Sequence, residues 1–422
     1  MRRPTLVAGA LLVLGGLVAA PSPVSAQPGQ CAAPADNVVR EIPWPQQRLA
    51  PRSAWALNQG GSTLVGVVDT GVSAAAPALA GRVLPGQDVL GSGPANNDCA
   101  GRGTFMAGLI AAGQTTGVGF AGIAPRARIL PIRVAQNPNE VDPGRLAAGI
   151  RAAVDGGAKV IAVSMGTPSP AADLRAAVDY AAGRDALVIA ASDMNVQDGQ
   201  TSYPAAFPSV LPVSGIDESG SPANRGGSNA PAQAPALVAP SSNVVSIAPA
   251  GAGHITASGG GIGVAFVAGA AALVRSYHPD LSAAQVRHRL EATADHPPAV
   301  LPDPALGFGV VDPRAALATV LPEESGDRPT PAPAPDVRVP PVPAADDTPV
   351  FIALAVTALT VSAASLGALA AALVTRGRRR KWRSAWAAGS QDDQPAGAVR
   401  ATTEETTEED VPVSRSTSSS AL

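Results

Sequence analysis

The sequence predicts an α/β domain in three layers, built on a mostly parallel sheet, followed by a single C-terminal transmembrane helix. Between about residues 56 and 320, short apolar runs alternate with alanine-rich segments of helical length. This alternation is typical of parallel strands covered by helices on both faces. An uncharged apolar stretch of about 25 residues, 350–374, is long enough to cross a bilayer. A Pro-rich segment, 323–349, separates the domain from this stretch.

Each element of the domain is predicted from its own apolar pattern. Strands are expected at the apolar runs 63–71, 128–134, 158–166, 186–192 and 209–216. Helices are expected over 143–155 and 171–184, and a wholly apolar central helix over 263–278. A last, amphipathic helix is expected over 281–294, with Ser282 as its N-cap.

The N-terminus has the pattern of a secretory signal peptide. Two arginines precede an apolar run, which ends in V-S-A at Ala26. A permanent N-terminal anchor is the alternative, but the apolar run is short and small residues follow it. The segment that follows Ala26 is therefore expected to be exported, up to residue 348.

The second apolar stretch is followed at once by basic residues: Arg376, Arg378, Arg379, Arg380, Lys381 and Arg383. The positive-inside rule places this end in the cytoplasm, so the domain lies outside the membrane in a single-pass type I arrangement. A buried core helix, the alternative, would not account for the basic cluster.

These features predict a domain organisation with six parts. They are a signal peptide (1–26), an N-terminal extension (27–55), the α/β domain (56–320), a Pro-rich linker (321–348), a transmembrane helix (349–375) and a disordered cytoplasmic tail (376–422). The net charge of −3 does not suggest binding to nucleic acid. Cys31 and Cys99, the two cysteines of an exported chain, are expected to form a disulfide. Neither has another soft ligand near it in sequence, so no metal site is expected, and no cofactor is implied.

Four motifs occur in an order that resembles the subtilisin-like serine proteases. They are VVDTGV (67–72), DCAGRGTFMAGLIAA (98–112), VIAVSMG (160–166) and SGGGIGVAFVAGAAALVR (258–275). The flanking sequences are similar to the mycosins, the membrane-anchored subtilases of actinobacterial type VII secretion systems. This resemblance covers nearly the whole chain except the cytoplasmic tail. It implies a subtilisin-like fold and, as partners, membrane components of a type VII secretion system.

The resemblance also assigns positions to the catalytic groups. The family aspartate falls on Asp69, which is retained, whereas Arg102 stands at the histidine position and Gly261 at the serine position. The oxyanion donor is expected at Met194, or at Asn195 after a one-residue insertion. The strand edge that pairs with substrate backbone in the family would consist of Ser164, Met165 and Gly166.

These replacements remove the chemistry of the triad. Gly261 has no nucleophile, and the Arg102 guanidinium has no lone pair with which to accept a proton. His254 is the one histidine that could approach the cleft, but it would do so from the wrong element. Ser258 precedes the central helix and is expected to be a turn serine. The sequence therefore predicts a pseudoprotease.

Arg102 is expected to pair with Asp69 through two N–H groups, in the space that Gly261 leaves open. An Arg102 side chain that extends into solvent is the alternative. Three functions stay open: a pseudoprotease with a structural or binding role, an active serine endopeptidase with a non-family constellation, and a module that grips extended peptides without cutting them.

Overall fold

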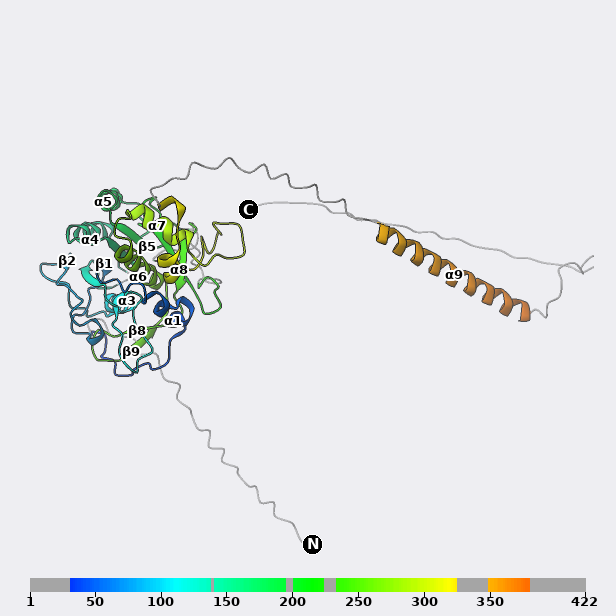
Figure 1. Ribbon diagram of the computed structural model, residues 1–422, viewed down its shortest axis with the longest axis horizontal. Coiled ribbons are helices and arrows are strands. Elements are labelled where there is room, and N and C mark those ends of the chain that lie inside the picture. Colours follow the sequence, from blue (N-terminus) through cyan, green and yellow to red (C-terminus); the bar gives the residue numbers. More distant parts are fainter. Residues whose placement is uncertain (1–30, 138–139, 195–199, 224–232, 325–347, 380–422) are drawn as a thin grey trace, which may run out of the picture. The chain divides into compact units, whose positions relative to one another are not determined.

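The computed structural model describes residues 31–137, 140–194, 200–223, 233–324 and 348–379 (Figure 1). The predicted signal peptide and most of the predicted linker and cytoplasmic tail lie outside the described residues. The chain divides into two compact units, Met1–Pro331 and Ala332–Leu422.

A seven-stranded parallel sheet forms the centre of the first unit, as the sequence predicts. Its strand order is β2-β3-β1-β4-β5-β6-β7. The strands are β1 Leu64–Asp69, β2 Gln87–Asp88, β3 Arg128–Arg133, β4 Val160–Val163, β5 Leu187–Ala191, β6 Leu211–Ile216 and β7 Leu237–Pro240. The sequence prediction does not include β7, nor β2, whose two residues are too few to show a pattern.

Helices cover both faces of this sheet. The described helices of the unit are α1 Trp44–Leu49, α2 Pro51–Ala54, α3 Arg102–Ala111, α4 Pro143–Asp155, α5 Ala172–Gly183, α6 Ile262–Tyr277, α7 Ala283–Ala292 and α8 Pro313–Ala318, with 3-10 turns η1 Pro77–Leu79 and η2 Pro322–Glu324. Ser282 caps α7 as expected, in a capping box with Gln285.

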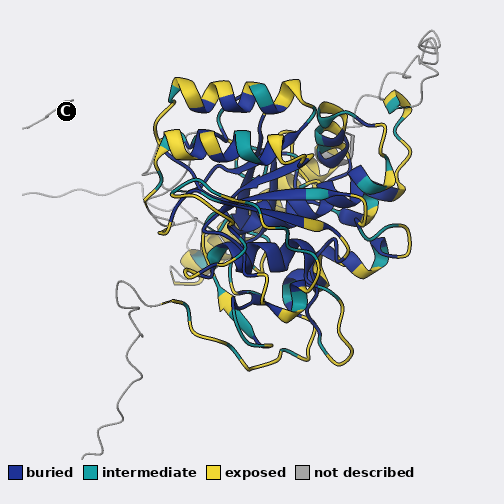
Figure 2. Cartoon of the chain, turned by 90° about the vertical axis from the view of Figure 1, so that its left-hand side faces the viewer, coloured by how far each residue is buried: buried dark blue, intermediate teal, exposed yellow. Residues whose placement is uncertain are grey.

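Two apolar cores result, one on each side of the sheet. Along β1, Val67 belongs to the core shared with α3 and α6, whereas Val68 belongs to the core shared with α4 and α5. Alternate side chains of a strand point to opposite faces, so a strand buried on both sides must be apolar throughout. Figure 2 shows the buried residues concentrated in the sheet and on the helix faces turned toward it. The central helix α6 is buried continuously from Ile262 to Arg275.

The N-terminal extension is bound to the domain by a disulfide and by backbone hydrogen bonds. Cys31 and Cys99 are bonded, with their Cα atoms 4.4 Å apart, which confirms the prediction. The next residue, Ala32, donates its N–H to the Cys99 carbonyl at 2.7 Å. Farther on, the Ala35 N–H reaches the Ala250 carbonyl in the turn of an antiparallel hairpin, β8 Val244–Ile247 and β9 His254–Ala257.

The folded part of the first unit continues to Glu324, beyond the expected domain end at residue 320. Arg289, only 2% exposed, donates from Nε to the Glu324 carboxylate at 2.8 Å. Its Nη1 donates to the carbonyls of Ala316 and Thr319, both at 2.9 Å. The buried Arg289 thus binds α8 and the residues that follow it, up to Glu324.

The second unit contains one described helix, α9 Thr348–Arg379. Its segment Phe351–Arg379 is long and apolar enough to cross a membrane. Three arginines, Arg376, Arg378 and Arg379, lie in its last turn. The predicted transmembrane helix is therefore supported by length and composition.

Candidate functional site

Asp69 is the last residue of β1, and its side chain is completely buried. Its Oδ1 accepts the N–H of Thr70 at 2.8 Å. Its Oδ2 accepts hydrogen bonds from the Ser164 hydroxyl and from the Arg102 guanidinium. The carboxyl ends of parallel strands are where active groups gather in α/β sheets, and Asp69 lies at such an end.

Arg102 is the first residue of α3, and it points inward. Its Nη1 forms the ion pair with Asp69 and also donates to the Ser164 hydroxyl at 2.9 Å. Its Nη2 donates to the Ser164 carbonyl at 2.7 Å. The predicted contact between Arg102 and Asp69 therefore occurs, and the solvent-exposed alternative does not, since 18% of the arginine side chain is exposed.

The pairing differs from the expectation in one respect. Only one arginine nitrogen reaches the Asp69 carboxylate, because the Ser164 carbonyl lies close enough to accept the other. Arg102 therefore links β1 to the segment directly after β4.

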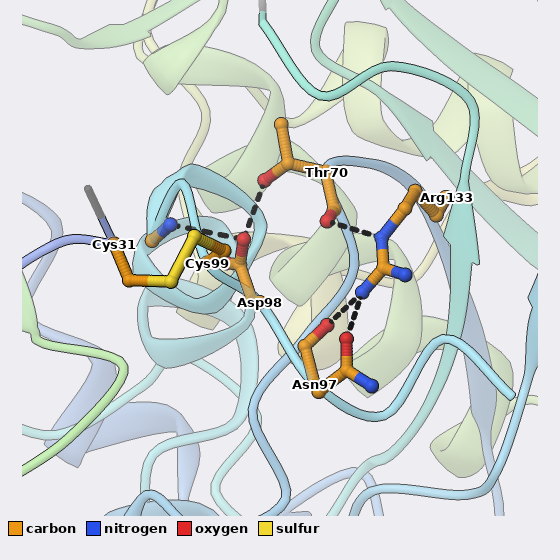
Figure 3. Close-up of a disulfide and its surroundings, with 7 residues drawn as sticks. Cys31, Thr70, Asn97, Asp98, Cys99 and Arg133 are labelled. Atoms are coloured by element: carbon orange, nitrogen blue, oxygen red, sulfur yellow. Dashed lines mark hydrogen bonds between the residues drawn. A yellow bond between two sulfur atoms is a disulfide. The ribbon is translucent and has the colours of Figure 1, made fainter. Parts of the chain in front are cut away.

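The loop before Arg102 is held by a second buried carboxylate, that of Asp98. It accepts the Thr70 hydroxyl at 2.9 Å, the Gly101 N–H at 2.9 Å and the Thr104 N–H at 2.8 Å. Burial raises the pKa of Asp98, and these hydrogen bonds oppose that shift. Figure 3 shows Asp98 beside the Cys31–Cys99 disulfide and bound to Thr70. This network fixes the start of α3 against the end of β1, and it thereby holds the backbone on both sides of Arg102.

Gly261 is the N-cap of α6 and lies at the same end of the sheet. Its φ of +82° is in the left-handed region that side chains rarely adopt. A Cβ at this position would lie 2.3 Å from the Ser164 carbonyl oxygen and 3.1 Å from Arg102 Nη2. The glycine therefore gives Arg102 room to enter the site, as expected.

Sequence reasoning missed Asp193, a buried aspartate just after β5 that contacts Gly261. Its Oδ1 accepts the Gly261 N–H at 3.2 Å, and its Oδ2 accepts the Gly215 N–H and the Ser214 hydroxyl, both at 3.2 Å. Burial raises the pKa of Asp193, opposed by these hydrogen bonds. A letter-by-letter comparison of AASD (190–193) with the family's A-A-G-N would have identified it.

Of the two positions expected for the oxyanion donor, only Met194 belongs to the described residues, and its side chain has no N–H to donate. Met194 lines a cavity of about 410 Å³ together with Arg102, Ile262 and, from the N-terminal extension, Ala32. Asn195 lies outside the described residues. The residue that accepts the Gly261 N–H is Asp193, which lies two residues after β5 and directly before Met194.

The other candidate side chains have structural contacts. The Nδ1 of His254 accepts the N–H of Val39 at 3.2 Å, and its ring packs edge-on against Phe120. Burial lowers the pKa of His254, which favours this neutral acceptor form. Ser258 accepts the N–H of Asn243 at 2.7 Å, as expected of a turn serine.

Ser164, Met165 and Gly166 follow β4, and the first two side chains are buried. The next residue, Thr167, exchanges backbone hydrogen bonds with Tyr203 at 2.8 and 2.9 Å. Among the residues that the structure describes, no group of three or more His, Cys, Asp or Glu side chains could hold a metal ion.

Comparison with known proteins identifies the family. Residues 60–314 match the model of the subtilase family, Peptidase S8. The chain belongs to the subtilase family. It is 34% identical over 404 residues to mycosin-3 of Mycobacterium tuberculosis, a match that covers 81% of this chain and 85% of that protein. It is also 34% identical over 251 residues to thermitase of Thermoactinomyces vulgaris, covering 60% and 87% of the two chains.

Solved structures of subtilases agree with this assignment. The crystal structure of MycP1 from Mycobacterium smegmatis superposes with a TM-score of 0.61 at 29% identity, covering 71% of this chain and 91% of that one. A structure of the serine protease MycP1, described as an essential component of the type VII (ESX-1) secretion system, has a TM-score of 0.60 at 31% identity, covering 70% and 94%. The predicted subtilisin-like fold is therefore confirmed.

Proposed function

We propose that this subtilase is a pseudoprotease, anchored in the membrane outside the cytoplasm, that serves a type VII secretion machine through its surface. One observation carries the proposal: the Arg102 guanidinium occupies the place between Asp69 and the position of the missing nucleophile. Serine hydrolysis needs a base that takes a proton there, and a guanidinium cannot take one near neutral pH.

The loss of catalysis is expected to be complete. Removing either the serine or the histidine costs about 10⁶ in turnover in the related subtilisin, a value taken from that enzyme. Here Gly261 and Arg102 replace both groups. His254, the histidine that could have approached, instead binds the backbone of the N-terminal extension.

The role in secretion is inferred from the relatives. Structures of MycP1 and MycP3 are described as proteases of the ESX-1 and ESX-3 type VII systems. The candidate membrane helix, ending in a basic cluster, supports an anchor with its C-terminus in the cytoplasm and the domain outside. Membrane components of such a system are therefore the proposed partners.

The alternative of a peptide-gripping module is less well supported. In the family, the segment at Ser164 pairs with substrate backbone, but here the Ser164 carbonyl already accepts a hydrogen bond from Arg102. A peptide bound in that register would compete with the Arg102 guanidinium for the Ser164 carbonyl.

The first test is direct. The purified full-length protein in detergent is incubated with an unfolded protein and with a fluorophosphonate probe, and an active serine protease is run in parallel. We expect neither cleavage nor labelling. Cleavage that persists through purification and is abolished by Asp69→Asn would establish the active-protease alternative instead.

The second test addresses the role. Deletion of the gene in the native host should impair secretion or assembly of the complex, and wild-type protein should restore it. Asp69→Asn, which keeps the size of the side chain, should restore secretion equally well. An active enzyme of this kind would lose about 10⁴-fold in turnover on that change, so failure to complement at normal protein levels would argue for catalysis.

A further inference from the structure

Asp193 is a buried carboxylate that the loss of the triad does not by itself explain. It is 7% exposed and follows β5 by two residues. Its two oxygens contact different elements: Oδ1 the N-terminus of α6 at Gly261, and Oδ2 the strand β6 at Gly215 and Ser214. In all three contacts the carboxylate accepts the hydrogen bond, from two backbone N–H groups and one hydroxyl.

We infer that Asp193 stands at the oxyanion position of the cleft and fills it with its own carboxylate. In an acyl-transfer site of this family, the backbone N–H at the nucleophile position and a neutral amide side chain together stabilise the oxyanion. Here Gly261 supplies the backbone N–H, and Asp193 stands where A-A-G-N has its asparagine. Both side-chain oxygens of Asp193 accept hydrogen bonds, and Oδ1 takes the Gly261 N–H that would otherwise face the substrate. The inference rests on the proposed loss of catalysis and gives it a further cause.

The glycine run before α6 fits this arrangement. A Cβ at Gly260 would lie 2.8 Å from the Asp193 carbonyl oxygen and 3.1 Å from its Oδ1. A Cβ at Gly261 would crowd Ser164 and Arg102 instead. The glycines of SGGG thus leave space for two side chains: that of Arg102, which binds Asp69, and that of Asp193, which binds the N-terminus of α6.

An aspartate at this position, in place of the family's amide, removes one donor from the oxyanion site. Removing one oxyanion-hole donor costs about 10²–10³ in turnover. Restoring histidine and serine alone should therefore leave the cleft inactive.

A labelling experiment tests this consequence. Full-length protein in detergent carries Arg102→His and Gly261→Ser, with Asp193 either kept or changed to Asn. We expect fluorophosphonate labelling at least about 10²-fold faster with Asn. Glu323→Gln in the same background is the control, because it removes one exposed negative charge away from the site. Equal labelling rates in the Asp193 and Asn forms would overturn the inference.

A binding experiment gives an answer even if the serine variant does not fold. The full-length protein is labelled with glycine that carries ¹³C at the carbonyl and ¹⁵N at the amide. An NMR experiment that correlates each amide with the preceding carbonyl then selects glycine amides that follow a glycine, among them that of Gly261. We expect acetate to leave this amide unchanged in the wild type and to shift it saturably in Asp193→Ala, where the N–H is free. An acetate response in the wild type, or none in the variant, would refute the occupied oxyanion position.

The two failures can be told apart. Proteolysis by the unaltered protein would refute the proposed function, whereas the acetate experiment reports only whether Asp193 covers the Gly261 N–H.

Discussion

Removal of the Arg102 side chain should destabilise the domain markedly, because the guanidinium is the charged partner of the buried Asp69 carboxylate. In Arg102→Ala, the Asp69 carboxylate stays completely buried and keeps only the Thr70 N–H and the Ser164 hydroxyl as partners. Breaking a buried ion pair by deleting one member costs about 3–5 kcal/mol. Because 18% of the Arg102 side chain is exposed, water can partly replace it, and we expect the lower end, about 3 kcal/mol.

For a domain of this size, about 3 kcal/mol corresponds to a decrease in melting temperature of roughly 6–12 °C. The assay is thermal unfolding of the full-length protein in detergent, followed by tryptophan fluorescence. The control is the double variant Asp69→Asn with Arg102→Met, which removes both charges. It should recover much of the loss, because no unpaired carboxylate is left in the interior.

Melting temperatures of Arg102→Ala within about 1 °C of the wild type would contradict this reasoning, since the expected shift is several times larger. The single variants Asp69→Asn and Arg102→Met complete the cycle. A double variant that loses as much stability as these two single variants together would show that Arg102 and Asp69 are not coupled.

Three further predictions follow from the described contacts. Replacing Cys31 and Cys99 with serine should lower the free energy of unfolding by about 4 kcal/mol, since the bond closes a loop with a sequence separation of 68; an unchanged denaturant midpoint would contradict this. Gly261→Ser alone should stay unlabelled by fluorophosphonate and lose about 1–2 kcal/mol from its positive φ, with Gly261→Ala losing a similar amount as the matched control. Because burial lowers the pKa of His254 in the folded state, stability should be lost as pH falls below the ordinary value of 6.5. His254→Gln should lose less between pH values of about 7.5 and 5.5 in urea unfolding, and parallel curves would show that this histidine is not responsible.

The sequence by itself determined the layered architecture and the residues that stand where the resemblance places the catalytic groups. Apolar runs and helical periods are local properties, so they predicted β1, β4, β5 and the buried helix α6 within a few residues. The absence of a nucleophile at Gly261 and of a base at Arg102 is likewise a matter of residue identity. The disulfide could also be predicted, because the sequence contains two cysteines, which have one pairing to form, and carries the pattern of an exported chain.

Tertiary structure alone decided which contacts Arg102 and Asp193 make at the carboxyl end of the sheet. The Arg102 guanidinium divides its hydrogen bonds between Asp69 and the Ser164 carbonyl, which are 33 and 62 residues away in sequence. Asp193 reaches the N–H of Gly261 across 68 residues. These contacts depend on how closely β4, β5 and the start of α6 approach one another, and on a positive φ at one glycine. Periodicity carries no information on such distances, so sequence could identify the altered residues but not the contacts that replace the triad.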